Sequence, residues 1–195
     1  MGIDPSDRQV TELIDRYNKW RRVYQYAGKG RLAPDEPDWE NGRLYFRRGY
    51  PYPDWTAYII ESDTDENFRV LHASTERRNT PIESLQAVFS RIEDAGKFII
   101  YETVTDLRAD CRMQSTTRKW RAQGLDPNVE KVMISDKQAK YILRSDPKVY
   151  FIAYSGGIQP YNHILPISYD ELDAVLLEDF PENVTSRLAA ESNLS

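Results

Sequence analysis

The sequence predicts one α+β domain, in which an antiparallel sheet of about five strands packs with three or four helices. Three observations predict it: a long amino-terminal segment with helical apolar spacing, short runs rich in aromatic and β-branched residues, and several residues placed to cap helices. A chain of 195 residues has the length of one large domain, and no linker or repeat divides it. We therefore expect 1–195 to be a single domain, with 181–195 as a polar tail that frays.

The first element is a helix at about 6–26. Its apolar positions, such as Leu13, Tyr17, Trp20 and Tyr24, recur at helical spacing and form one stripe. Ser6 and Gln9 have the spacing of a capping box at its start, and glycines at 28 and 30 favour an end shortly after 26.

Three strand-like runs follow a proline-rich loop at 31–41. The runs at 43–48, 55–61 and 67–73 are rich in aromatic and β-branched residues, and their connections are short enough for hairpins. They predict an antiparallel meander. Thr80, Pro81 and Glu83 then have the pattern of a capped helix start, which predicts a helix at 82–93.

The segment 98–105 is ambiguous between helix and strand. Its composition is typical of a strand, but Ile100, Val104 and Leu107 also fit a helix, which we favour after a break at Gly96. Further on, we expect a loop at 114–128, a strand at 131–135 and a short helix at 137–143. A central strand at 148–154 and a helix at 168–178, capped by Ser168, complete the predicted fold.

Composition indicates a cytoplasmic protein. No apolar run approaches the roughly 20 residues that a membrane span needs, so we expect no membrane partner. The first residues lack the basic and apolar regions of a secretory signal. The single cysteine, Cys111, cannot form an internal disulfide, which suits a reducing compartment.

Charge is unevenly distributed along the chain, whose net charge is −5. The stretch 108–121 is basic, and the end from 168 onward is strongly acidic. The two stretches either attract each other within the fold or face partners of opposite charge. Because the whole chain is acidic and has no nucleic-acid-binding signature, we do not expect a nucleic-acid partner.

The sequence does not predict catalytic or metal-binding chemistry. His72 and His163 are the only histidines, and neither has the spacing of a metal ligand or of a base beside a nucleophile. Asp63 begins a run that resembles a calcium loop, but Phe68 stands where that loop requires glycine. We therefore expect no catalytic residue, no metal and no cofactor.

Two surfaces are candidates for binding a protein partner. The hairpin turn at 49–55 concentrates tyrosine and tryptophan near arginines, and these residue types anchor protein interfaces. The alternative is that its rings pack on the domain's own core. The second candidate is the loop at 155–166, for which the favoured alternative is an ordinary connection to the last helix. The acidic turn after 62 would add complementary charge. The expected partner-binding residues are Tyr50, Tyr52, Trp55, Asp63, Asp65, Glu66, Tyr161 and Asn162.

The segment 163–177 carries a resemblance to a known family. Its residues Ile164-Leu165-Pro166, Ser168 and Asp170-Glu171-Leu172 are similar to the carboxyl-terminal LLP-S-DEL stretch of bacterial polymorphic-toxin immunity proteins. That family includes the immunity factor of the mycobacterial necrotizing toxin, an NAD-glycohydrolase. The resemblance, together with a meander that leads into a capped helix, covers a third to a half of the chain.

The resemblance implies a non-catalytic antitoxin that binds a co-encoded protein toxin, such as an NAD-glycohydrolase, and occludes its active site. Two other functions stay open. The first alternative is a small enzyme that uses carboxylates or tyrosines, and the second is a general protein-interaction adaptor. A deep pocket that holds a carboxylate of perturbed pKa would favour the enzyme.

Overall fold

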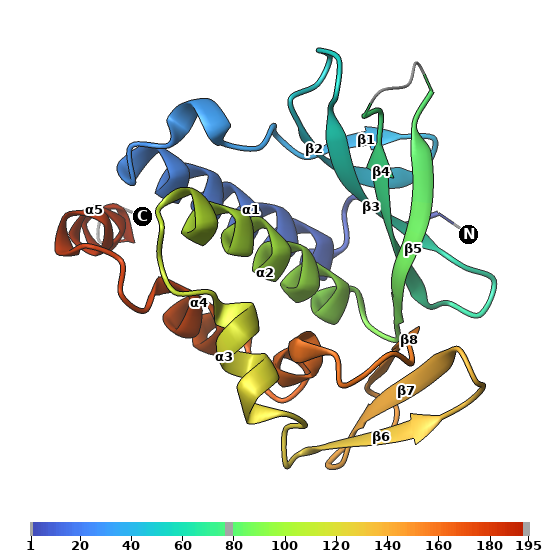
Figure 1. Ribbon diagram of the computed structural model, residues 1–195. Helices are drawn as coiled ribbons and strands as arrows, with labels where there is room; N and C mark the ends of the chain where they lie inside the picture. The colour runs from blue at the N-terminus through green and yellow to red at the C-terminus, as the bar shows by residue number, and fades with distance from the viewer. Residues whose placement is uncertain (1, 77–79, 193–195) are drawn as a thin grey trace.

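The computed structural model describes residues 2–76 and 80–192, and within them eight strands form one antiparallel sheet in the order β1-β2-β3-β4-β5-β8-β7-β6. The helices lie on one side of this sheet (Figure 1). The strands are β1 Asp38–Glu40, β2 Arg43–Arg48, β3 Thr56–Ser62, β4 Phe68–Ser74, β5 Ile82–Phe89, β6 Val129–Met133, β7 Gln138–Leu143 and β8 Tyr150–Tyr154. The helices are α1 Arg8–Tyr26, α2 Ile92–Asp110, α3 Thr116–Gln123, α4 Tyr169–Leu177 and α5 Glu182–Ser192, with short 3₁₀ turns η1 Gly30–Leu32 and η2 Pro160–Ile164.

Three predicted regions are confirmed. Helix α1 buries the apolar stripe, although Asp7 rather than Ser6 caps it by accepting from the amide of Gln9. Strands β2, β3 and β4 form the expected meander, with Tyr58 facing His72 across β3 and β4. Helix α4 begins at a complete capping box in which Ser168 and Glu171 bond reciprocally.

The helix predicted at 82–93 is wrong. Residues Ile82–Phe89 form strand β5, which pairs with β4 along its whole length, and α2 begins only at Ile92. The local capping pattern at Thr80 and Glu83 competes with a full ladder of hydrogen bonds offered by β4. The tertiary pairing wins, as it often does over local propensity.

Helix α2 resolves the ambiguity at 98–105 in favour of a helix, but it runs through Gly96 without the predicted break. A Cβ atom at Gly96 would lie 2.4 Å from the hydroxyl of Tyr169 and 2.6 Å from a methyl of Leu13. This glycine therefore permits close packing of α2 against α1 and α4.

Three further predictions are corrected by packing. The expected loop at 114–128 contains α3, capped by Ser115 and held by the buried Trp120. The expected short helix at 137–143 is strand β7, because it lies between β6 and β8 and pairs with both. The expected fraying tail contains α5, which buries Val184 and Leu188. The sheet consequently has more strands than the five predicted.

The core has a main part and a small outer part. The main part lies between the sheet and the helices, with Trp20, Phe89 and Tyr101 among its largest members. The outer part is a cluster on the helix-free face of the sheet, formed by Tyr45, Ala57, Ile59, Leu71 and Ala73. Long charged side chains cover it, since Arg43 pairs with Glu61 and Glu83 at 2.9 and 2.7 Å.

The sheet is divided near β5. Strand β8 pairs with β5 only over 87–89, so the first residues of β5 diverge from the β6–β8 part.

Candidate functional site

The β2–β3 hairpin holds an aromatic group centred on one arginine. The guanidinium carbon of Arg47 lies 4.1, 4.8 and 5.9 Å from the ring centres of Tyr45, Tyr50 and Trp55. Arg47 also pairs with Asp38 and Glu40 of β1, and only 5% of it is exposed. We call Arg47, Tyr45, Tyr50 and Trp55 the Arg47 platform.

The predicted hairpin residues divide between the core and the surface. Trp55 packs partly against the outer cluster, as the alternative interpretation expected. Tyr50 is 50% exposed and Tyr52 is 73% exposed, so their rings are available to a partner. Because the buried guanidinium and the Trp55 ring, whose centre lies 5.7 Å away, fix the position of the Tyr50 ring, a partner would meet a preorganised ring there.

The acidic turn lies at the other end of the meander. Asp63 accepts hydrogen bonds at 2.9 Å from the amides of Asp65 and Asn67, so its carboxylate shapes the turn. Asp65 and Glu66 are exposed. Since alternate turns of a meander lie at opposite ends of a sheet, these carboxylates and the hairpin tip do not form one compact site.

Tyr161 and Asn162 do not lie on an open loop as expected. They belong to η2, where Asn162 is completely buried. Its side chain accepts from the amide of Asp126 at 2.8 Å and donates to the carbonyls of Gly124 and Gln159. Asn162 therefore links the chain after α3 to η2 by hydrogen bonds. Its expected role as a partner contact is corrected to a structural role inside the fold.

Tyr161 belongs to a second cluster that the sequence did not predict. The Tyr58 ring lies 5.2 Å from His72 and 6.0 Å from Phe98, and the Phe98 ring lies 4.8 Å from Tyr161. The hydroxyl of Tyr58 donates to Glu102 at 3.4 Å. We call Tyr58, His72, Phe98, Glu102 and Tyr161 the Glu102 cluster.

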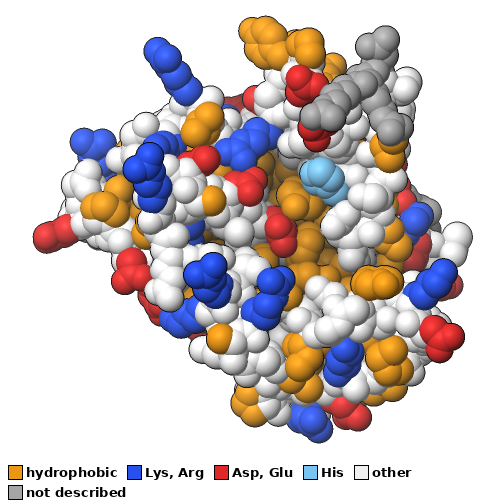
Figure 2. All heavy atoms as spheres, in the orientation of Figure 1, with side chains coloured by type: hydrophobic (Ala, Val, Ile, Leu, Met, Phe, Trp, Pro, Cys, Tyr) orange, Lys and Arg blue, Asp and Glu red, His pale blue; other side chains and the backbone are white. Residues whose placement is uncertain are grey.

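The Glu102 cluster borders a hollow. In the space-filling view, the surface between the helices and the sheet is recessed, and apolar, acidic, basic and histidine side chains border the recess (Figure 2). Tyr58, His72 and Glu102 are all partly exposed, whereas Phe98 is buried beneath them. The cluster joins β3, β4, α2 and η2, which are far apart in the sequence.

Burial sets the electrostatics of this cluster. Desolvation and the nearby carboxylate of Asp106 raise the pKa of Glu102 to about 7. Desolvation also lowers the pKa of His72, which favours a neutral imidazole, and raises the pKa of Tyr161. Asp106 itself has a raised pKa from burial, although Arg48 contacts it at 2.8 Å.

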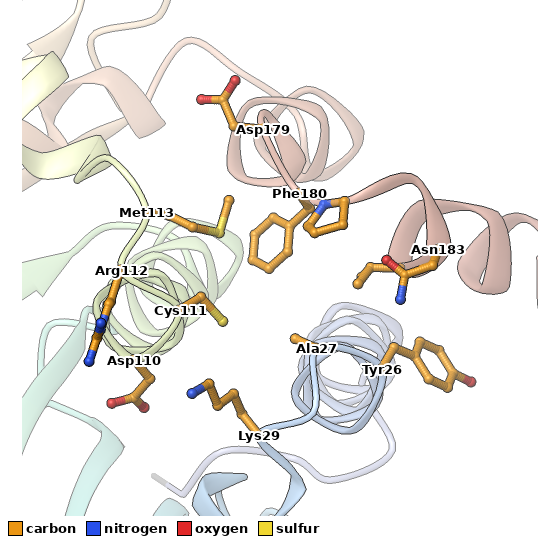
Figure 3. Close-up of a pocket in the computed structure, with 12 residues that line it drawn as sticks. Tyr26, Ala27, Lys29, Asp110, Cys111, Arg112, Met113, Asp179, Phe180 and Asn183 are labelled. Atoms are coloured by element: carbon orange, nitrogen blue, oxygen red, sulfur yellow. The ribbon is translucent and has the colours of Figure 1, made fainter.

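A separate pocket lies where α1 and α2 end beside the α4–α5 connection (Figure 3). Its volume is about 460 Å³, within the range of small-molecule sites. Cys111, Met113 and Phe180 point into the same space, and Lys29 and Asp110 also line it. Burial raises the pKa of the Cys111 thiol, which favours the unreactive protonated form.

The basic stretch and the acidic end meet within the fold. Buried Arg108 donates to the carbonyls of Leu176 and Glu178 at 3.0 and 2.7 Å. Lys119 bonds the carboxylate of Glu178 at 2.5 Å. Of the two interpretations of these charges, internal attraction therefore accounts for Arg108 and Lys119.

Within residues 2–76 and 80–192, no group of three or more histidine, cysteine or acidic side chains is placed to hold a metal ion. No helix in the same residues has the length and apolar character to cross a membrane.

Comparison with known proteins identifies a fold relationship. No family model and no curated protein matches the chain. The solved structure of Rv3902c from M. tuberculosis is similar, with a TM-score of 0.53 and 13% sequence identity. The match covers 86% of this chain and 88% of that one. At this identity the likeness extends to the fold alone.

Proposed function

We propose that this chain is a non-catalytic antitoxin of the immunity-protein type, which binds a co-encoded bacterial toxin and occludes its active site. The proposal combines the resemblance at 163–177 with the Arg47 platform. The platform is the observation that carries it, because it holds the exposed Tyr50 ring on a rigid base next to the exposed Tyr52.

The platform has the physical properties of an interface anchor. Tyrosine, tryptophan and arginine bury large areas at low entropic cost and dominate measured interface energies. Tyr50 and Tyr52 would insert into the toxin, and buried Arg47 would hold the Tyr50 ring in place. Because the Tyr50 ring is ordered before binding, less conformational entropy is lost when that ring is buried on association.

Inhibition requires tight binding. A nanomolar dissociation constant corresponds to about −12 kcal/mol, which a few well-packed anchors supply more readily than scattered surface charge. The acidic residues Asp65 and Glu66 would act mainly on the association rate and its salt dependence.

The experiment is a titration of toxin activity with the purified chain. The protein to be tested as the toxin is the product of the gene adjacent to the one that encodes this chain. We expect activity to fall linearly and to vanish at one chain per toxin, because an occluding inhibitor acts by stoichiometric binding. Undiminished toxin activity at a severalfold excess of the chain would contradict the proposal.

A small carboxylate-based enzyme is the second candidate. Glu102, whose pKa is raised to about 7 beside the Tyr58 hydroxyl, favours it, since general acids and bases work best near the ambient pH. The same titration separates the two. An enzyme that detoxifies a toxin product would protect at far less than one chain per toxin, and Glu102→Gln would abolish that protection.

A further inference from the structure

We propose that the hollow beside Glu102 receives an arginine side chain of the partner protein, with the guanidinium bonded to the Glu102 carboxylate. This inference rests on the proposed function, because the arginine would belong to the toxin. It assigns a specific chemistry to a surface that is separate from the Arg47 platform.

The first argument is that Glu102 lacks a charge partner. The buried carboxylate of Asp94 pairs with Arg91 and Lys97 at 2.7 and 2.8 Å. That of Asp173 pairs with Lys19 at 2.7 Å and with Arg16 at 3.2 Å. Glu102 accepts one long hydrogen bond from Tyr58 and forms no ion pair with any described residue.

The second argument is the surface around the carboxylate. A guanidinium stacks on aromatic faces and forms bidentate bonds with carboxylates. The Tyr58 ring, whose hydroxyl bonds Glu102, and the neighbouring His72 ring supply partly exposed aromatic surface, and the largely buried Tyr161 lies behind them against Phe98. Within the described part of the chain, neither the Tyr161 hydroxyl nor the His72 imidazole makes a hydrogen bond, so both retain capacity for a ligand.

The third argument is the sign of the local field. Asp106 lies one turn after Glu102 on α2, and its carboxylate is 61% exposed although Arg48 bonds it. The carboxylate of Asp110 contacts the same Arg48 guanidinium at 3.4 Å. The charged groups that these ion pairs place along α2 beside Glu102 are thus two carboxylates and one arginine. With His72 neutral, this side of the site carries net negative charge that attracts a cation, while Lys and Arg side chains lie elsewhere on the rim of the recess (Figure 2).

The occupant follows from these three features. A lone carboxylate held away from water is costly unless a proton or a cation compensates it. In the free chain a proton on the Glu102 carboxylate compensates its charge, as its pKa of about 7 indicates. A bound guanidinium would replace that proton, so binding should release it and strengthen as the pH rises from 6 to 8.

The test uses the full chain and N-acetyl-L-arginine amide as probe, followed by NMR. We expect saturable shifts of the Glu102 carboxyl and of the Tyr58 and Tyr161 rings, with a dissociation constant on the order of millimolar for so small a ligand. The affinity at pH 8 should exceed that at pH 6 by roughly tenfold, because the deprotonated fraction of a group with pKa about 7 rises by that factor.

Two controls make the result specific. Glu102→Gln, which preserves the size of the side chain, should abolish the saturable shifts. Glu12→Gln, at an exposed position of α1, should leave them unchanged. N-acetyl-L-citrulline amide, a neutral analogue of the probe, should not bind. Shifts that persist in Glu102→Gln, or that spread over the surface without saturating, would overturn the assignment. Because the probe replaces the toxin, failure here leaves the toxin titration unaffected, and failure of that titration leaves this result standing.

Discussion

Single residues in this chain show how buried charge is compensated. Arg47 is stabilised on an otherwise open sheet face by Asp38, Glu40 and the rings around it. Lys97 is fully buried, yet its ammonium group contacts the carboxylate of Asp94 at 2.8 Å and donates to the carbonyl of Ile167 at 2.7 Å. Glu102 is the contrast, since among the residues that the structure describes only the Tyr58 hydroxyl bonds it.

The first prediction concerns stability at Glu102. Its folded pKa, about 7, exceeds the ordinary value of 4.5, so the stabilisation from the protonated form is fully present below pH 4.5 and is lost as pH rises through 7. The Glu102→Gln side chain is neutral at every pH, so its contribution to stability does not fall as the pH rises. We expect the free energy of unfolding of the variant to equal that of the parent near pH 4.5 and to exceed it by roughly 1–3 kcal/mol at pH 8.

Urea unfolding of both proteins across this pH range measures the difference. The exposed control Glu12→Gln should show no comparable gain at pH 8. Equal stability of Glu102→Gln and the parent at every pH would mean that water, rather than protein, surrounds the carboxylate.

At the scale of elements, the segments predicted correctly are those whose local pattern and tertiary environment agree. The apolar stripe of α1 and the capping box of α4 each mark a boundary that packing preserves. The segment Ile82–Phe89 carries a helix-start pattern but lies along the free edge of β4. No local pattern reports that edge, so β5 was not predictable from its own residues.

The candidate site follows the same rule. The exposed tyrosines of the hairpin were predictable because the turn itself presents them. The Glu102 cluster was not, since it requires β3, β4, α2 and η2 to meet. One signal was visible in the sequence: Glu102 interrupts an apolar run at 98–104 that forms the buried middle of α2.

The second prediction tests how α2 packs on its neighbours. In Gly96→Ala, the added methyl would meet Tyr169 at 2.4 Å and Leu13 at 2.6 Å. We expect an overpacking cost of roughly 1–3 kcal/mol, which exceeds the gain of about 1 kcal/mol in helix propensity. Thermal and urea unfolding should therefore show a net loss of stability.

A double-mutant cycle identifies the cause. Tyr169→Phe removes the atom nearest the added methyl, so it should cost less stability in the Gly96→Ala background than in the parent. A Gly96→Ala protein more stable than the parent would show that Gly96 is not required for close packing.

At the scale of the whole molecule, the fold presents two different surfaces to a partner. The helix-free face ends in the Arg47 platform, and the inner face opens at the Glu102 cluster beside α2. The opposite charges of the middle and the end of the chain are partly used internally, as Arg108 and Lys119 show. The rings of Tyr50 and Tyr52, by contrast, remain at least half exposed at the surface.

The measurement that tests the central claim most directly is the affinity of hairpin variants for the toxin. Tyr52→Ala removes the most exposed ring, and Tyr154→Ala on β8 is a matched control, because the two tyrosines are 73% and 67% exposed. We predict that Tyr52→Ala weakens binding by about 2–4 kcal/mol, some thirtyfold to a thousandfold, while Tyr154→Ala binds like the parent. Circular dichroism should confirm that both variants fold. A folded Tyr52→Ala protein that binds the toxin as tightly as the parent would contradict the claim that the hairpin anchors the complex.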